Sequence, residues 1–268
     1  MGAARAAVII IGLGLGLVAC GGDSPPRCDE VLFGVPNATT GLTADQCGPS
    51  CACDGEAAWV APVYTADDVA ALRAWVLTTP PLLLATDPYA SPAPPIADGT
   101  YCAVIRDDVA TRQYHLQTFA SRAAAEAAGA APTHAGPCGM CSSLEDLAVY
   151  ITQPDLTAPV RACGLMYPSG PAADHVQCLR DLGFTEPCAQ IWYFNTVHTR
   201  GACLGPCLLA LEAPYHTPDG ALNECLQCDE VQSGAVFKAI AGRTRRNSGV
   251  PSAMCRPCSE VERLVHRY

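Results

Sequence analysis

The sequence predicts an α+β fold that is mainly α, with disulfide-rich short helices around a small antiparallel β-hairpin. Three observations lead to this prediction. The 268-residue chain holds 17 cysteines, its second half has apolar residues at helical spacing, and two strand-like segments lie between residues 100 and 120. Half of the residues are apolar, which is enough for a sizeable core.

Sixteen cysteines follow Cys20, an even number that can pair completely. An oxidising compartment favours disulfides for such a set. Each bridge typically adds ~2–4 kcal/mol by restricting the unfolded chain. The sequence leaves the pairing open. The sixteen are Cys28, Cys47, Cys51, Cys53, Cys102, Cys138, Cys141, Cys163, Cys178, Cys188, Cys203, Cys207, Cys225, Cys228, Cys255 and Cys258.

Residues 28–60 form a turn-rich entry in which no regular element is expected. A helix begins after Thr65, which can cap it, and places Val69, Leu72 and Val76 on one face. Prolines from Pro80 onward end this helix and make residues 80–98 a long loop.

That loop suggests a division of the chain. We expect a signal peptide over 1–19, a flexible tether over 20–27, a cysteine-stapled region with one helix and a Pro-rich loop over 28–98, and a hairpin with a cysteine-rich helical region over 99–268. Residues 28–268 as a single domain remain an open alternative.

The strand pattern covers residues 101–105 and 113–119 and predicts an antiparallel hairpin. Ser121 then caps an alanine-rich helix that ends near Gly129, and residues 130–134 read as a loop.

The strongest helix prediction follows Cys141, where Ser142 and Glu145 form a capping box. Four apolar residues lie at helical spacing behind it, namely Leu144, Leu147, Ala148 and Ile151. Further helices are expected over 172–182, 186–198, 204–212, 223–242 and 258–266, the last with a capping box at Ser259 and Glu262.

The N-terminal segment carries an apolar run over 6–18 that is too short to span a bilayer and ends in Leu17-Val18-Ala19-Cys20. These residues resemble the lipobox of bacterial lipoproteins. The resemblance implies that Cys20 is acylated and anchors the chain in the lipid bilayer of the cell envelope. The glycine after the cysteine, Gly21, resembles the residue found there in lipoproteins that are sent to the outer membrane. This resemblance implies a domain that faces the periplasm or the cell surface.

A dinucleotide-binding glycine loop is the rival interpretation, because Gly12 and Gly14 follow an apolar run. The third glycine of that fingerprint is missing, since Leu17 occupies its place. Pro25 and Pro26 then break the helix that the fingerprint requires. We therefore favour the export signal.

The formal net charge of −10 argues against nucleic acid as a partner, because phosphate binding needs clustered cations. The charge is uneven, since residues 233–268 hold seven Lys or Arg and two Glu. We expect this basic tail to pack on the acidic body.

Cys138 and Cys141 form a CxxC motif directly before the capped helix, where unpaired amides lower the pKa of a thiol. They are a candidate redox pair. The alternative, which we favour, is that each belongs to a separate structural bridge, because no βαβ unit surrounds the motif.

Metal binding is a second hypothesis. Two further CxxC pairs, Cys225 with Cys228 and Cys255 with Cys258, are candidate zinc ligands, although the spacing between the pairs exceeds the usual pattern. A Cu(I) site from His134, Met140 and the first CxxC pair is chemically feasible. Disulfide formation competes with both.

The segment Gly242–Gly249 presents three guanidinium groups, on Arg243, Arg245 and Arg246. Guanidinium forks match carboxylate or phosphate oxygens, so the segment is a candidate anion-binding loop. The alternative is a solvated turn or ion pairs with Asp229 and Glu230.

No hydrolase or nucleotide-binding signature occurs, so the sequence does not favour an enzyme and implies no cofactor. We expect a membrane-anchored exported lipoprotein whose disulfide-stapled domain binds a protein or small-molecule ligand, or supports the envelope. The alternative is a periplasmic thiol-disulfide oxidoreductase or metal-handling protein that uses Cys138 and Cys141.

Overall fold

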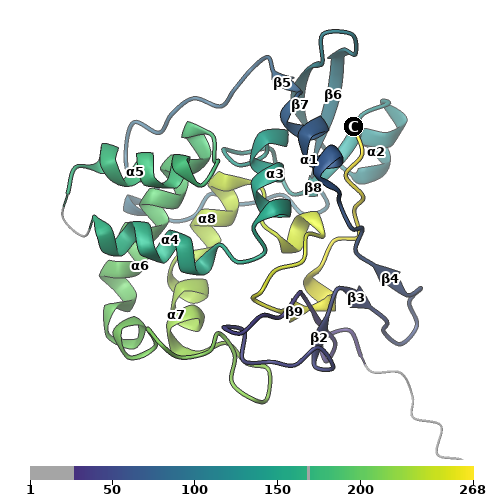
Figure 1. Cartoon of the computed structure of the whole chain (residues 1–268). Coiled ribbons are helices and arrows are strands. Elements are labelled where there is room, and N and C mark those ends of the chain that lie inside the picture. Colours follow the sequence, from purple (N-terminus) through teal and green to yellow (C-terminus); the bar gives the residue numbers. More distant parts are fainter. Residues whose placement is uncertain (1–26, 168–169) are drawn as a thin grey trace, which may run out of the picture.

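A computed structural model describes residues 27–167 and 170–268 (Figure 1). The expected signal peptide, Cys20 and nearly all of the expected tether lie outside these residues. Helices α4 to α8 gather on one side of the molecule, and the largest sheet lies on the other with α1, α2 and α3 beside it. The α+β prediction is confirmed.

The largest sheet has the strand order β5-β7-β6-β8. Its strands are β5 (Val76–Leu77), β6 (Tyr101–Asp108), β7 (Gln113–Phe119) and β8 (Ala131–Ala135). The expected hairpin is present as β6 and β7, which pair antiparallel, but it forms the centre of this larger sheet rather than a separate unit.

Strand β8 corrects the expected loop over 130–134. Its backbone pairs antiparallel with β6, and Tyr101 lies opposite Ala135. Pro132 obscures the strand in the sequence, yet an edge strand tolerates a proline because one side of its backbone needs no partner.

Helix α1 (Ala66–Arg73) begins as predicted, because the Thr65 side chain accepts from the backbone N–H of Asp68. Val69 and Leu72 are buried. Val76 does not share their face: the helix ends at Arg73, and Val76 lies in β5, where it is largely exposed.

Helix α2 (Arg122–Ala127) is capped by Ser121, as expected. Helix α3 (Leu144–Thr152) begins one residue later than predicted, because its cap is Ser143 rather than Ser142. The Ser142 hydroxyl does not cap the helix, because it accepts a hydrogen bond from the backbone N–H of Gly139 and contacts His134 Nε2.

The helical region contains α4 (Thr157–Met166), α5 (Ala172–Asp181), α6 (Glu186–Leu209), α7 (Glu224–Gln232) and α8 (Gly234–Ala241). Helix α4 was not expected from the sequence. The expected helices 186–198 and 204–212 are one element with a kink at Cys203, where φ is −120°. The expected helix 223–242 is interrupted at Ser233 and divides into α7 and α8.

The predicted helix over 258–266 is wrong. Only a 3₁₀ turn forms, η3 (Cys258–Glu260), and the chain then runs extended. The reason is tertiary pairing: Glu262 N donates to Arg246 O, and His266 N donates to the Tyr64 hydroxyl. Two other 3₁₀ turns are η1 (Pro88–Ala90) and η2 (Arg246–Ser248).

Short strands join the two ends of the described chain. A sheet of order β2-β1-β9 combines β2 (Cys47–Gly48), β1 (Leu32–Phe33) and β9 (Arg256–Pro257), and β3 (Ser50–Cys51) pairs with β4 (Trp59–Val60). The segment over 28–60 is therefore paired with the C-terminal segment, by which we mean residues 242–268.

Within the described residues, eight disulfides pair all sixteen cysteines, which confirms the disulfide prediction. They are Cys28–Cys53, Cys47–Cys255, Cys51–Cys258, Cys102–Cys138, Cys141–Cys188, Cys163–Cys178, Cys203–Cys228 and Cys207–Cys225.

The main core lies where α3 meets α1, α5 and α6, and fully buried Leu144, Leu147, Leu179 and Ile191 belong to it. Among the described residues, no helix has the length and apolar character needed to cross a membrane.

Candidate binding cavity

The CxxC motif before α3 does not form a redox pair in this structure. Cys138 is bridged to Cys102 of β6, and Cys141 is bridged to Cys188 of α6. Each cysteine thus fastens the start of α3 to a different neighbouring element. The geometry agrees with two separate structural bridges rather than with one bridge between Cys138 and Cys141.

His134 is fully buried in β8, and both of its ring nitrogens have protein partners. Nε2 lies 2.7 Å from Ser142 Oγ, and Nδ1 lies 2.9 Å from Ala135 O. Burial, assisted by the Arg243 charge, lowers the pKa of His134 well below its usual value. The ring is held neutral within the sheet, and neither nitrogen is left for a metal.

The other metal-ligand candidates also lie in disulfides. Cys225 and Cys228 pair with cysteines of α6, and Cys255 and Cys258 pair with the N-terminal segment. Metal ions bind the thiolate form of cysteine, and a sulfur in a disulfide is not a thiolate.

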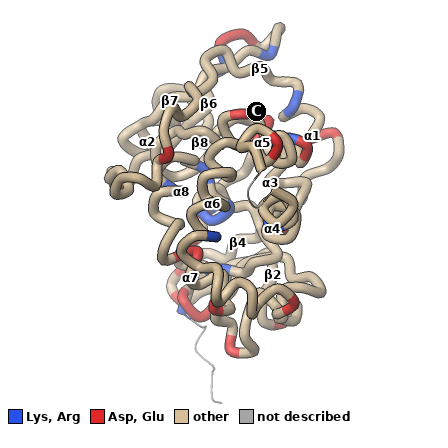
Figure 2. The backbone as a smooth tube through the Cα atoms, turned by 90° about the vertical axis from the view of Figure 1, so that its left-hand side faces the viewer, with Lys and Arg blue, Asp and Glu red and all other residues tan. Residues whose placement is uncertain are grey.

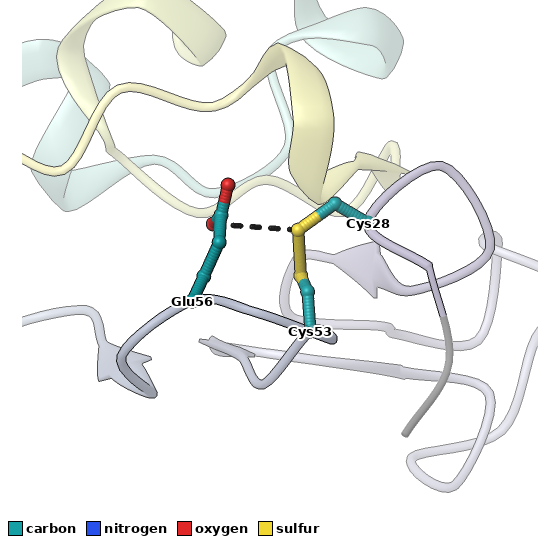
Figure 3. A group of neighbouring side chains, drawn as sticks. All are labelled: Cys28, Cys53 and Glu56. Carbon is teal, nitrogen blue, oxygen red and sulfur yellow. Dashed lines mark hydrogen bonds between the residues drawn. A yellow bond between two sulfur atoms is a disulfide. The ribbon is translucent and has the colours of Figure 1, made fainter. Parts of the chain in front are cut away.

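Figure 3 shows a remaining cluster of ligand-type side chains, formed by Cys28, Cys53 and Glu56. The two cysteines are bridged to each other, and Glu56 Oε2 lies 3.4 Å from Cys28 Sγ. Glu56 also pairs with Arg263. Because both sulfurs are in a disulfide, the only remaining metal ligand of this cluster is the Glu56 carboxylate, which already pairs with the Arg263 guanidinium.

Arg243 of the predicted anion-binding loop is fully buried and serves the fold. Its Nε donates to Cys141 O at 3.1 Å, and its Nη atoms donate to the carbonyl oxygens of Thr133 and Ser142. It thereby joins β8 to the turn before α3. Burial lowers its pKa, and the Tyr268 hydroxyl opposes that shift.

Arg245 and Arg246 are also occupied. Arg245 donates to Tyr150 O at 2.6 Å, to Pro251 O and to Gln153 O, whereas Arg246 pairs with Glu230 and Glu260. The three guanidinium groups of the expected anion-binding loop therefore already have partners within the protein, and the expected site is not formed. Their contacts join the C-terminal segment to β8, α3 and α7.

Charges are scattered over the chain rather than gathered on one element (Figure 2). Tail arginines pair as expected with acidic residues of the body, Arg256 with Glu230 and Arg263 with Glu56.

A cavity of about 310 Å³ lies in the helical region, within the size range of small-molecule sites. Five helices, α3, α4, α6, α7 and α8, line it together with residues of the C-terminal segment. Its apolar lining includes Val160 and Leu165 of α4, Leu204 and Leu208 of α6, Leu226 of α7 and Phe237 of α8.

One face of α6 runs along the cavity. Lining residues recur on it at Trp192, Asn195 and Thr199 before the kink at Cys203, a spacing that keeps side chains on one side of a helix, and at Leu204 and Leu208 after it. At 1.5 Å per residue, the part from Trp192 to Thr199 extends roughly 10 Å. The lining therefore continues along α6 on both sides of the kink.

The rim of the cavity carries exposed leucines beside charged side chains such as Arg161, Arg200 and Lys238. Leu165, Leu204, Leu208 and Leu211 line the cavity and are 57%, 50%, 53% and 40% exposed. Such a concentration of exposed leucines around an apolar cavity is typical of a binding surface. Leu209, which is 85% exposed, does not line the cavity.

Two residues that line the cavity, Tyr150 and Trp192, each carry a buried polar atom without a hydrogen-bond partner of normal geometry, the Tyr150 hydroxyl and Trp192 Nε1. Tyr150 is only 2% exposed. An unsatisfied buried donor costs about 1–3 kcal/mol, so such groups are uncommon in folded proteins. Both atoms lie behind the surface of the cavity rather than on it.

A satisfied polar strip crosses the cavity between α6 and α7. Asn195 Nδ2 donates to Asp229 Oδ1 at 3.4 Å, Thr199 donates to the same oxygen, and Tyr89 donates to Asn195 Oδ1 at 2.7 Å. Burial raises the pKa of Asp229, and the Thr199 hydrogen bond opposes that shift. Tyr89 belongs to the Pro-rich loop, which therefore packs against α6.

The cysteine, histidine and arginine motifs of the sequence do not indicate this cavity. The available signal was the apolar pattern of Leu204, Leu208 and Leu211, which the helix expected over 204–212 would place on one face. In the structure Leu211 lies just beyond the end of α6. Helix α4, which forms the facing wall, was missed because Pro159 and Gly164 interrupt its pattern.

Comparison with protein families gives one match, to a family of unknown function (DUF8771), over residues 172–264. Comparisons with curated proteins and with solved structures give no match. The matched residues include α5 to α8 and most of the C-terminal segment, and so contain much of the cavity wall. The chain is thus a disulfide-rich protein similar over this part to that family, and its function must be argued from the cavity.

Proposed function

We propose that this protein is an exported lipoprotein whose helical region binds a largely apolar molecule. The observation that carries the proposal is the apolar cavity of about 310 Å³ along α6 with its solvent-exposed leucine rim. Burial of apolar ligand surface supplies roughly 25 cal/mol per Å², so such a lining favours hydrocarbon.

The eight disulfides support an oxidising location, and they also support preorganisation of the cavity. Cys203–Cys228 and Cys207–Cys225 fix α6 to α7, and Cys163–Cys178 fixes α4 to α5. A wall held in place by covalent bonds loses little entropy when a ligand binds. The bridges therefore act as a scaffold for the site.

The test is a fluorescence titration with N-phenyl-1-naphthylamine, a neutral apolar probe, on the full chain carrying Cys20→Ser. This substitution removes the expected acylation site, so that no detergent is needed. We expect saturable binding. Leu204→Trp places a large side chain in the cavity wall and should weaken binding at least tenfold.

Leu209→Trp is the matched control, because it adds the same side chain on the same helix outside the cavity. It should bind the probe like the parent chain. Equal weakening by both substitutions, or no saturable binding by the parent, would contradict the proposed function.

Anchoring at Cys20 is a separate part of the proposal and rests on the resemblance to lipoprotein signals. We expect the unaltered chain to partition with membranes through acyl groups and the Cys20→Ser chain to be released from them. Membrane partitioning of the Cys20→Ser chain with acyl chains still attached would reject this part while leaving the cavity proposal intact.

A further inference from the structure

Two arginines lie among the exposed leucines at the rim of the cavity. Arg161 of α4 and Arg200 of α6 both line the cavity, and both are partly exposed. Arg161 Nη1 donates to Leu211 O at 3.5 Å, and Arg200 Nη1 donates to Gly164 O at 3.3 Å. Because Leu165 follows Gly164, each guanidinium lies beside the backbone of an exposed rim leucine.

The two arginines belong to one section of the rim. Arg200 reaches from α6 to the last turn of α4, where Gly164 is three residues after Arg161. Residues three apart are neighbours on the surface of a helix, and they are separated by roughly 4.5 Å along its axis. Both positive charges therefore lie where α4 faces α6 at the mouth of the cavity.

The charges of these two arginines are not neutralised within the protein. A guanidinium carries five N–H donors, and each group uses one of them on a backbone carbonyl. Over residues 27–167 and 170–268, no carboxylate lies within ion-pairing distance of either group. Both groups therefore keep their positive charge and have donors left for an anion.

The two acidic residues of the cavity lining, Asp229 and Glu230, have other partners. Glu230 pairs with two arginines of the C-terminal segment. Asp229 belongs to α7 and accepts from Thr199, whereas the neighbouring Arg200 contacts α4. Since the lining holds six Lys or Arg residues against these two acids, the cavity is a basic region of a protein whose net charge is −10.

We infer that the cavity binds an amphiphile with an anionic head group, a carboxylate or a phosphate, which accepts hydrogen bonds from Arg161 and Arg200 at the rim while the hydrocarbon lies against the apolar lining. Guanidinium forks match the oxygens of both anions. This inference rests on the proposed function and adds the chemical class of the ligand and its direction in the cavity. No covalent bond is made or broken.

The experiment is displacement of bound N-phenyl-1-naphthylamine from the Cys20→Ser chain by four dodecyl compounds below their micelle concentrations: dodecanoate, dodecyl phosphate, dodecanol and dodecyltrimethylammonium. At least one anion should displace the probe at a concentration about tenfold lower than dodecanol, and the better of the two identifies the head group. The trimethylammonium compound should be the weakest of the four. A protein with a net charge of −10 attracts cations overall, so its net charge cannot produce this order.

Arg161→Gln and Arg200→Gln should each weaken binding of the preferred anion about fivefold and leave binding of dodecanol unchanged. Unchanged dodecanol binding shows that the cavity of the variant is intact. Arg200→Lys keeps the charge and should retain most of the affinity. Arg180→Gln is the matched control, because Arg180 is an exposed arginine of α5 outside the cavity.

The parent chain allows a second measurement that needs no substitution. Its preference for the anion over dodecanol should decrease at least about threefold between about 0.02 M and about 0.5 M salt, because salt screens partly exposed charges. A preference that does not change with salt would overturn the inference.

Failure of this inference differs from failure of the proposed function. If the probe binds and responds to Leu204→Trp, but dodecanol competes as well as both anions or Arg180→Gln weakens the anion as much as Arg200→Gln does, the anionic head group is overturned and the cavity function stands. If the probe does not bind and none of the four compounds changes protein fluorescence, the proposed function itself fails.

Discussion

Histidines and arginines that look like surface or ligand residues in the sequence are buried parts of the fold here. His266 is 2% exposed, its Nε2 lies 2.7 Å from Ser248 O, and its Nδ1 lies 3.0 Å from the Tyr268 hydroxyl. Because the Ser248 carbonyl can only accept, the proton is on Nε2 and the Tyr268 hydroxyl donates to Nδ1. The ring is neutral and fully used.

This burial predicts an acid-dependent loss of stability. Desolvation, assisted by Arg243, lowers the pKa of folded His266 to about 3, against about 6.5 when unfolded. The unfolded chain therefore binds the extra proton between these values, and stability falls as pH falls below 6.5. One such group contributes up to about 1.4 kcal/mol per pH unit.

His266→Gln, which keeps a side-chain N–H donor, should remove that part of the pH dependence. Urea unfolding between pH 4 and 7 measures it, and an unchanged slope in the variant would contradict the assignment. His134, also buried, should keep part of the slope in both chains.

Residue-scale roles were the least predictable from the sequence. Charged residues are almost never fully buried, so Arg243 was assigned to a loop surface. Its actual partners, carbonyl oxygens of Cys141, Thr133 and Ser142, are about a hundred residues away in the chain. No local pattern identifies them.

At the scale of elements, α4 and α6 approach closely at Gly164. A Cβ added at Gly164 would lie 2.5 Å from Thr196 Cγ2. The absence of a side chain thus sets the distance between two helices that face each other across the cavity.

Gly164→Ala should therefore destabilise the chain by about 1–3 kcal/mol, although alanine is the better helix former. Adding Thr196→Ser removes the clashing methyl group, keeps the hydroxyl that donates to Trp192 O, and should restore most of the loss. Thermal unfolding measures the stability of the two variants. A Gly164→Ala variant that is more stable than the parent chain would show that α4 and α6 do not meet at Gly164.

Capping residues made several elements predictable. Thr65 and Ser121 set the starts of α1 and α2 as the sequence indicated. Tertiary pairing overrode local preference elsewhere: β8 forms despite Pro132, and the capping box at Ser259 and Glu262 does not produce a helix because Glu262 N donates to Arg246 O instead.

At the scale of the whole molecule, two disulfides close nearly the same long loop. Cys47–Cys255 spans 208 residues and Cys51–Cys258 spans 207. In the chain-entropy account, a bridge stabilises by restricting the unfolded chain, and either of these bridges restricts it almost as much as both together.

Replacing one pair by alanine should therefore cost less than replacing Cys163–Cys178, whose 15-residue separation corresponds to about 3 kcal/mol. Replacing both long-range pairs together should cost about 5 kcal/mol. Urea unfolding of the three variants measures this, and additive costs for the two long-range pairs would reject the account.

The sequence predicted complete pairing of the sixteen cysteines but not which cysteines pair, because connectivity depends on the fold. The cavity, like the disulfide connectivity, depends on the fold and could not be predicted from local sequence patterns. Its walls come from α3, α4, α6, α7, α8 and the C-terminal segment, and only their packing creates it.

The most direct test of the central claim is a crystal structure of the protein grown with N-phenyl-1-naphthylamine. The account predicts density for this apolar molecule in the cavity beside α6, in contact with Leu204 and Leu208. An empty cavity with the molecule bound elsewhere, or α4 packed directly onto α7 so that no cavity remains, would contradict it.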